Sequence, residues 1–196
     1  MTTSGRIQVL RAGERPATAW LNGGGVTREV AGFPVGAGLD AFDWRVSLAD
    51  VASAGPFSVF PGIDRVITLV EGAGMVLTVD GAEQSIDTPY RPFAFPGDAS
   101  TDCRLLGGPV VDFNVMTRRG RVEASVDIAT APADVHVPTG GTTLLVCLAG
   151  TARLDGTELA CYDAALLTAP GPYGLRPDAA ATAAAAVAVV TFHPSS

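Results

Sequence analysis

Three arginines of this 196-residue chain lie in otherwise apolar, strand-like stretches: Arg28, Arg45 and Arg65. The planar guanidinium group of arginine binds a carboxylate through two parallel hydrogen bonds. An arginine directed into a β-barrel would therefore bind a small organic acid. The alternative is an ion pair at a solvated strand surface with a neighbouring carboxylate such as Asp64 or Glu29, and the sequence alone leaves it open.

Aromatic and polar side chains near these arginines could complete such a site. Phenylalanine and tryptophan would form apolar walls, and asparagine or threonine would orient a ligand. The predicted ligand-binding set contains Arg65, Arg28, Arg45, Asn22, Thr27, Trp44, Phe60, Asp64, Phe93, Phe95 and Asn114, with Phe57 as a further wall residue. The aromatic residues could equally belong to an ordinary hydrophobic core. No catalytic residue is assigned.

The segment 20–30 (WLNGGGVTREV) contains three consecutive glycines beside an aromatic and an amide side chain. Consecutive glycines cost backbone entropy on folding, so they indicate close approach of the backbone to a neighbour or a ligand. A glycine-rich loop before a polar edge strand is the alternative. The segment lacks the order of strand, glycine turn and helix that is typical of a nucleotide-binding loop.

The composition predicts a packed, all-β protein. Hydrophobic residues make up 47% of the chain and charged residues 17%, while 23 glycines and 14 prolines are spread along it, as many turns require. The net charge of −7 argues against nonspecific binding to nucleic acid. We find no signal-peptide pattern, no apolar run of bilayer length and no CxxC pair among the three cysteines. We therefore expect a cytoplasmic protein with buried free thiols and no membrane partner.

Short β-rich runs bounded by glycine or aspartate predict the strands, for example at residues 7–10, 43–48, 65–70 and 75–79. The dipeptides Asp80-Gly81 and Asp155-Gly156 each lie between two such runs and predict two-residue hairpins. Residues 179–188 have helical propensity but continue into the strand-like run 187–192. We favour a strand there and leave a helix open.

An internal repeat runs through the chain. Residues 67–97 and 145–171 share the order strand, glycine turn, strand, Asp-Gly hairpin, strand and Pro-Gly turn. The join falls near the charged stretch 118–123. We therefore predict two domains, an N-terminal one at residues 1–118 with the ligand pocket and a degenerate C-terminal copy at residues 119–196.

This repeated order resembles the cupin pattern. Cupins are small jelly-roll barrels, so the resemblance implies two tandem cupin-like (RmlC-like jelly-roll) barrels packed as a bicupin. A typical cupin binds metal through histidines before the glycine turn and after the Pro-Gly turn, but the corresponding stretches 55–65 and 98–102 contain none. The two histidines, His136 and His193, lie elsewhere and far apart in sequence, and the sequence leaves open that they meet in space as one two-histidine site. We predict no metal site and no cofactor, and Arg65, which ends the first stretch, becomes the strongest ligand-binding candidate.

Five segments are similar, in order, to the motifs of the HutD/Ves family: residues 20–30, 43–47, 55–65, 91–95 and 112–118. Leu21 departs from the pattern, because the family usually has lysine or arginine there. The resemblance implies a bicupin with its pocket in the first barrel and a tie to histidine utilisation, in which an intermediate such as urocanate or formiminoglutamate is sensed. Ves-type members are associated with stress responses instead, and the resemblance implies no established catalytic activity.

Three functions remain open on the sequence. The first is a metal-independent protein that binds a small anionic metabolite in a regulatory role. The second is a metal-free cupin enzyme, isomerase- or epimerase-like, in which Asp64, Asp112, Glu29 or Tyr90 would act as acid or base. The third is a structural or interaction protein with an empty barrel. We favour the first and leave a homodimer open.

Overall fold

The computed structural model describes residues 7–21, 23–178 and 184–195. Within these ranges the chain forms nineteen β-strands and one 3-10 helix, η1 (Ala12–Glu14), and no α-helix, which confirms the prediction of an all-β protein. The strand expected near the C-terminus is present as β19 (Ala186–Pro194), whereas residues 179–183 lie outside the described ranges. No helical segment within these ranges has the length and hydropathy that crossing a bilayer requires.

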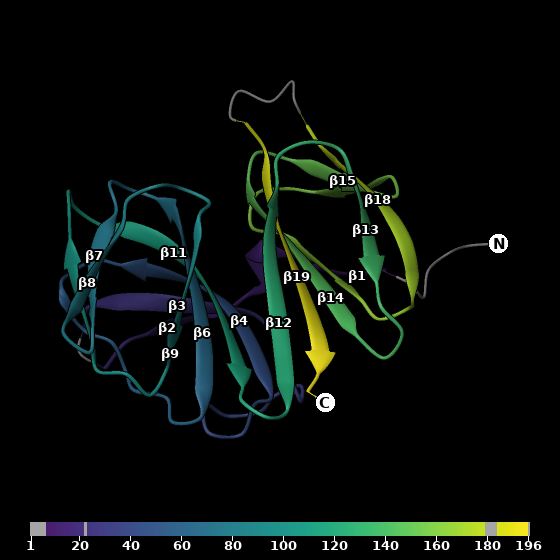
Figure 1. Ribbon diagram of the computed structural model, residues 1–196. Coiled ribbons are helices and arrows are strands. Elements are labelled where there is room, and N and C mark those ends of the chain that lie inside the picture. Colours follow the sequence, from purple (N-terminus) through teal and green to yellow (C-terminus); the bar gives the residue numbers. More distant parts are fainter. Residues whose placement is uncertain (1–6, 22, 179–183, 196) are drawn as a thin grey trace. The chain divides into compact units, whose positions relative to one another are not determined.

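The chain divides into two compact units (Figure 1). We name them for their place in the sequence. The central unit is Arg15–Arg121, and the terminal unit combines Met1–Glu14 with Val122–Ser196.

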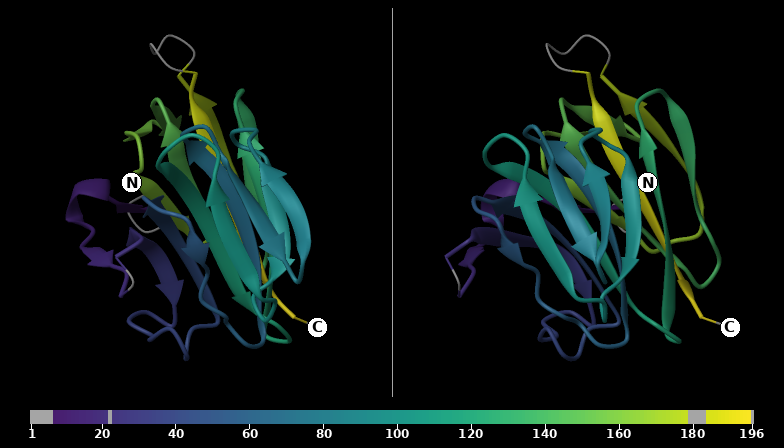
Figure 2. Two further views of the ribbon diagram at one scale, coloured as in Figure 1. Left: turned by 90° about the vertical axis from the view of Figure 1, so that its left-hand side faces the viewer. Right: turned by 60° about the vertical axis from the view of Figure 1, so that its left-hand side comes forward.

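Two antiparallel sheets form the central unit (Figures 1 and 2). The larger sheet has the strand order β2-β3-β4-β11-β6-β9 and the smaller has the order β5-β10-β7-β8. The strands are β2 (Ala17–Ala19), β3 (Gly25–Phe33), β4 (Trp44–Val51), β5 (Gly55–Pro56), β6 (Ile63–Glu71), β7 (Met75–Val79), β8 (Ala82–Ile86), β9 (Pro92–Pro96), β10 (Thr101–Leu105) and β11 (Val110–Arg118).

Apolar side chains from both sheets meet in the core of the central unit. Ile67 and Leu69 of the larger sheet are fully buried in one cluster with Met75 and Leu77 of the smaller. Burial of each such side chain contributes about 1.5–3 kcal/mol. One face of the larger sheet is therefore directed toward the smaller sheet, and we call it the inner face.

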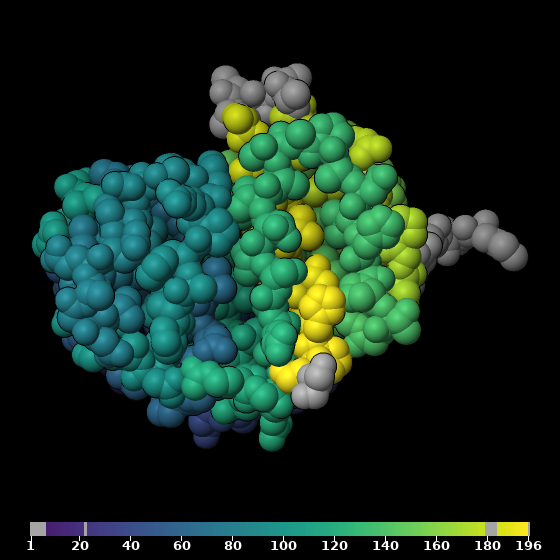
Figure 3. Space-filling model, viewed as in Figure 1, coloured from purple at the N-terminus to yellow at the C-terminus, as the bar shows by residue number. Residues whose placement is uncertain are grey.

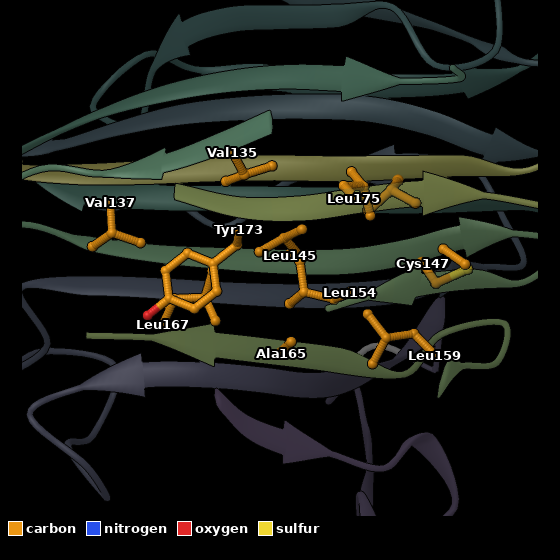
Figure 4. Packing of buried hydrophobic residues seen from close by; sticks show 12 residues of the cluster. Val135, Val137, Leu145, Cys147, Leu154, Leu159, Ala165, Leu167, Tyr173 and Leu175 are labelled. Carbon is orange, nitrogen blue, oxygen red and sulfur yellow. The ribbon is translucent and has the colours of Figure 1, made fainter. Parts of the chain in front are cut away.

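The terminal unit also consists of two antiparallel sheets, with the orders β1-β17-β14-β19-β12 and β13-β18-β15-β16. Figure 4 shows its apolar core, in which the buried Tyr173 donates a hydrogen bond of 2.9 Å to the carbonyl of Ala169. In Figure 3 the green strip of β12 lies beside the yellow strip of its partner β19. The strands are β1 (Ile7–Leu10), β12 (Val122–Ala129), β13 (Ala133–Val137), β14 (Thr142–Ala149), β15 (Ala152–Leu154), β16 (Thr157–Leu159), β17 (Ala164–Leu167), β18 (Gly171–Pro177) and β19.

The two units repeat one strand order. The run β4-β11-β6-β9 in the central unit corresponds to β12-β19-β14-β17 in the terminal unit, and β5-β10-β7-β8 corresponds to β13-β18-β15-β16. The two predicted hairpins also match: Asp80 and Asp155 both have φ of 46°, and each is followed by a glycine with positive φ, as a type I′ turn requires. The repeat predicted from the sequence is thus present in the structure.

The unit boundaries differ from the predicted domains at the N-terminus. Residues 7–10 were expected in the first domain, but β1 pairs with β17 of the terminal unit, where it covers the outer edge of that strand. Arg11 and the backbone N–H of Ala12 both donate hydrogen bonds to the Asp163 carboxylate, at 2.6 Å and 2.8 Å. These bonds attach the residues that follow β1 to the terminal unit. An exposed strand edge carries unpaired backbone groups, so such a pairing is favourable wherever the chain can reach.

Gly72→Ala is expected to lower the free energy of unfolding by about 2–4 kcal/mol. Gly72 has φ of 99°, and an added Cβ would lie 2.6 Å from the carbonyl oxygen of Pro109. Gly81 has φ of 86° but no atom within 4 Å of an added Cβ. Gly81→Ala is therefore a matched control, expected to cost only about 1 kcal/mol through backbone strain. Urea denaturation measures both, and equal losses would contradict a role for the close approach to Pro109.

Candidate functional site

The strand register of the larger sheet brings polar residues together on the inner face. Residues directly opposite in an antiparallel pair direct their side chains to the same face. Three rows of such residues cross the inner face, and they include the core residues Ile67, Leu69 and Phe95. The first row consists of Arg45, Met116, Arg65 and Phe95; the second consists of Glu29, Ser47, Asn114, Ile67 and Phe93; the third consists of Thr27, Ala49, Asp112 and Leu69.

Arg65 is buried among three aromatic rings. It is 6% exposed, and its Cζ atom lies 5.3 Å from the ring centroid of Phe57, 5.6 Å from that of Phe60 and 4.9 Å from that of Phe95. Aromatic faces attract a guanidinium group electrostatically. Among the described residues, Nε of Arg65 has no hydrogen-bond partner, and no ion pair includes this arginine. Arg65 is thus a buried cation that no carboxylate from the described part of the chain contacts directly.

Two further buried polar side chains on the inner face belong to the adjacent strand β11. Asp112 is 1% exposed and Asn114 is 7% exposed. The Oδ1 atom of each lacks a hydrogen-bond partner within the described part of the chain. Buried polar atoms without a partner are unfavourable and rare in native proteins, and they are typically satisfied by water, an ion or a ligand. We call Arg65, Asp112 and Asn114 the polar cluster.

Burial changes the ionisation of the polar cluster. Removal from water raises the pKa of Asp112 to about 7, although the charge of Arg65 opposes this increase. Burial also lowers the pKa of Arg65 to about 10, although Asp112 opposes that decrease. Arg65 therefore remains cationic at neutral pH, while Asp112 is partly protonated. Burial raises the pKa of Cys103 on β10 to about 11, and Asp112 contributes to this shift, as expected for a carboxyl directed toward the smaller sheet.

Partly exposed residues flank the polar cluster. The indole Nε1 of Trp20 donates a hydrogen bond of 2.7 Å to Oγ1 of Thr27, and the Trp20 ring meets the Phe57 ring edge-on at 6.4 Å. Nε of Arg45 donates to Oε2 of Glu29 at 2.7 Å. Arg45 is thus already paired with a carboxylate, in contrast to Arg65.

The structure brings most of the predicted site residues together. Phe93 stacks on Phe95 with centroids 5.9 Å apart, beside the row that contains Arg65. The predicted residues on the inner face or in contact with Arg65 are Arg65, Arg45, Thr27, Phe57, Phe60, Phe93, Phe95 and Asn114. Their role in ligand binding stays a prediction.

Three predicted site residues are not brought into this group. Arg28 is opposite Leu48 in the register and forms an ion pair with Asp50. Trp44 and Asp64 share a row with Thr117, one residue out of step with Arg65, and therefore lie on the opposite face of the sheet. The alternation of side chains along a strand is the reason, because each of these residues is an odd number of positions from an inner-face residue. Asn22 lies outside the described residues.

Asp112 is the residue that the predicted ligand-binding set lacked. It had been considered only as an acid or base of an enzyme. Its sequence signal was its position two residues before Asn114, because positions i and i+2 of a strand share a face. The spacing does not reveal that Asp112 is buried or that its Oδ1 atom lacks a hydrogen-bond partner among the described residues.

The terminal unit provides an internal comparison for the polar cluster. The N–H groups of Tyr90 and Tyr162 donate to the carbonyls of Leu69 and Cys147, which aligns β6 with β14. In this alignment and the strand registers, the positions of Arg65, Asp112 and Asn114 are occupied by Thr143, Val187 and Val189. The repeated strand order therefore forms in the terminal unit with a threonine and two valines at these positions, and the polar cluster is not a requirement of the fold.

Both histidines lie in the terminal unit, whereas the polar cluster belongs to the central unit. His136 is in β13 and His193 is in β19, which belong to different sheets of the terminal unit. Within the described ranges, no three histidine, cysteine, aspartate or glutamate side chains are grouped as metal ligands would be. The three cysteines, which all lie within the described ranges, form no disulfide; Cys103 and Cys147 are buried as expected, whereas Cys161 is exposed.

Solved structures of low sequence identity define the class of fold. The Escherichia coli bacterial pirin YhhW, whose structure is a complex with nickel(II), superposes with a TM-score of 0.67 at 8% identity over 97% of this chain and 100% of the pirin. Quercetin 2,3-dioxygenase from Acinetobacter baumannii superposes with a TM-score of 0.63 at 13% identity over 96% of this chain and 79% of the enzyme. The chain therefore has a cupin-like, all-β fold.

Within this class the chain belongs to the HutD family, whose family model matches residues 12–187. HutD from Pseudomonas fluorescens SBW25, solved in a formate condition, is 31% identical and superposes with a TM-score of 0.82 over 97% of this chain and all of that chain. Protein Ves from Citrobacter koseri is 36% identical over 75% of this chain and 78% of its own length. An uncharacterized 21.2 kDa protein in the hutC 3′ region of Pseudomonas putida is 44% identical over 61% of this chain, and the match spans 62% of that relative.

Proposed function

We propose that the chain binds a small carboxylate through Arg65 and has a regulatory role, without using a metal. The observation that carries the proposal is a cationic side chain, 6% exposed, that lies close to three aromatic rings and has no ion-pair partner among the described residues. A buried charge without a partner is strongly unfavourable, and an anionic ligand would remove that penalty. Guanidinium groups bind carboxylates through paired, charge-assisted hydrogen bonds.

We further propose that the two units are tandem cupin-like jelly-roll barrels that form a bicupin, with the ligand in the barrel of the central unit. The matching strand orders of the two units support a duplication. The distribution of polar residues supports one ligand site, because the apolar interior of the terminal unit has Val187 and Val189 where the central unit has Asp112 and Asn114.

The name of one relative and the gene neighbourhood of another favour a metabolite of histidine utilisation as the ligand. One solved relative is named HutD, and another relative is encoded in a hutC 3′ region. Urocanate and formiminoglutamate are both carboxylates of this pathway and are the first ligands to test. The Ves relatives leave a stress-response metabolite as the competing choice.

A metal-free isomerase- or epimerase-like enzyme is the second candidate. The observation that favours it is Asp112, because a carboxyl with a pKa of about 7 is suited to both accept and donate a proton near neutral pH. Following each candidate ligand by NMR in the presence of the protein separates the two functions. A stable ligand spectrum supports a binding protein, and conversion of the ligand supports the enzyme.

Thermal unfolding with added acids tests the binding proposal. A ligand present at 100 times its Kd, and bound only by the folded state, stabilises a protein by about 2.7 kcal/mol. We expect millimolar urocanate, formiminoglutamate or formate to raise Tm by roughly 4 °C or more for at least one acid. The neutral amide of the same acid is the matched control and should have little effect. Equal shifts with acid and amide, or none with any carboxylate, would contradict the proposal.

A further inference from the structure

We infer that the ligand carries an N–H hydrogen-bond donor in addition to its carboxylate, and that Asp112 and Asn114 bind this donor. The inference rests on the proposed function, in which Arg65 binds the carboxylate. It narrows the ligand from any small acid to carboxylates that bear an imidazole, amide or amidine group.

The buried acceptors of the polar cluster carry the inference. Oδ1 of Asp112 and Oδ1 of Asn114 are both buried and have no hydrogen-bond partner among the described residues. A carboxylate ligand alone would satisfy the donors of Arg65 but would bring only further acceptors to these two oxygens. An N–H group of the ligand would donate to one of these oxygens or share its hydrogen between both, and a carboxyl keeps one acceptor oxygen in either protonation state.

The spacing of the cluster fits one ligand with two polar ends. Arg65 is opposite Met116, and Asn114 and Asp112 are two and four residues further back along β11. Successive inner-face positions of a strand are about 7 Å apart, since each residue advances the chain by about 3.4 Å. The aromatic rings of Phe93 and Phe95 lie in the same rows and would cover the apolar part of the ligand. A carboxylate separated from its N–H group by a short unsaturated or apolar linker matches this order.

The comparison between the two units indicates that Asp112 and Asn114 serve ligand binding and are not needed for folding. Valine occupies both equivalent positions in the terminal unit, so the fold does not require a carboxyl or an amide there. Buried polar atoms that lack a partner destabilise a protein and are expected where they serve binding or catalysis.

A matched pair of ligands tests the inference by calorimetry at pH 7. Urocanate has a ring N–H group, whereas 3-(2-furyl)acrylate has the same carboxylate and a ring of similar size without an N–H donor. We expect the wild-type protein to bind urocanate at least about tenfold more tightly, because leaving buried acceptors unpaired costs binding free energy. Asp112→Val and Asn114→Val, which introduce the residue of the terminal unit, should each lose most of this preference while still binding the furan compound.

Controls separate this inference from the proposed function. Asp64→Asn removes a carboxylate from the opposite face of the same sheet and should keep the preference for urocanate. Retained binding of the furan compound by the valine variants shows that they are folded. Equal affinity of the wild-type protein for both compounds, or a preference that survives both valine substitutions, would overturn the inference and leave carboxylate binding intact. Failure of both compounds to bind would count against the proposed function itself.

Discussion

Arg65→Met is expected to reduce carboxylate affinity by at least about 100-fold and, in the absence of ligand, to raise the free energy of unfolding by about 1 kcal/mol or more. The loss of affinity follows because the guanidinium group is the only buried cation of the polar cluster. The gain in stability follows because a methionine of similar length packs against the Phe57, Phe60 and Phe95 rings without the cost of burying a charge. Calorimetry measures the affinity, and urea denaturation measures the stability.

Arg28→Met is the matched control for this prediction. It removes an arginine from the same sheet, but one that is half-exposed, lies on the opposite face and pairs with Asp50. We expect unchanged carboxylate affinity and a change in stability below about 1 kcal/mol, as is usual for exposed ion pairs. If Arg65→Met weakens carboxylate binding and increases the free energy of unfolding, Arg65 serves ligand binding and not folding. A large loss of stability in Arg65→Met would instead show that the guanidinium group supports the fold.

The second large effect is a decrease in stability as pH rises from about 4 to about 7, caused by Asp112. Burial raises the pKa of Asp112 in the folded protein to about 7, whereas an unfolded aspartate has a pKa near 3.8. Between these values the folded state binds a proton that the unfolded state does not, so the free energy of unfolding falls with increasing pH and then levels off above pH 7. Each unit of pKa difference corresponds to about 1.4 kcal/mol, which makes the total effect a few kcal/mol.

Asp112→Asn isolates this contribution. Asparagine keeps the size and one acceptor oxygen of the side chain but does not titrate. We expect the difference in unfolding free energy between pH 5 and pH 8, measured by urea denaturation, to be smaller in this variant by a few kcal/mol. The Asp102→Asn variant, which replaces an exposed carboxyl, should show the same pH dependence of the unfolding free energy as the wild-type protein. If the unfolding free energies of the wild-type protein and of Asp112→Asn change with pH by the same amount, burial does not hold the Asp112 carboxyl neutral.

Local patterns were sufficient to predict much of the molecule. The two Asp-Gly hairpins depend on the φ angles that neighbouring residues adopt, and Asp80 and Asp155 have the predicted conformation. The all-β class, the internal repeat and the family resemblance follow from such short-range patterns and are confirmed. Phe93 and Phe95 were also predicted as wall residues of the site; strand alternation places these two on one face, although the pairing of β9 with β6 sets their place beside Arg65.

Long-range pairing decided what these patterns left open. Arginines at positions 28, 45 and 65 all occur in strand-like contexts, but only the register of β3, β4, β6 and β11 determines which of them shares the inner face with Asn114. The pairing of β1 with β17 joins residues more than 150 positions apart, which no local pattern encodes. A shift of register by one residue reverses the face of every side chain, so local periodicity cannot assign the inner face of a strand that is buried on both sides.

The sequence by itself therefore determined the all-β class, the repeat, the hairpins and the family, because these depend on the types and spacing of neighbouring residues. Tertiary structure decided that Arg65 is buried among aromatic rings with no ion pair to any residue that the structure describes, while Arg28 and Arg45 are paired with Asp50 and Glu29. It also decided that Asp112 is buried and resists ionisation. Burial and charge pairing are properties of the packed sheets, since they depend on which distant strands face each other and how completely they exclude water.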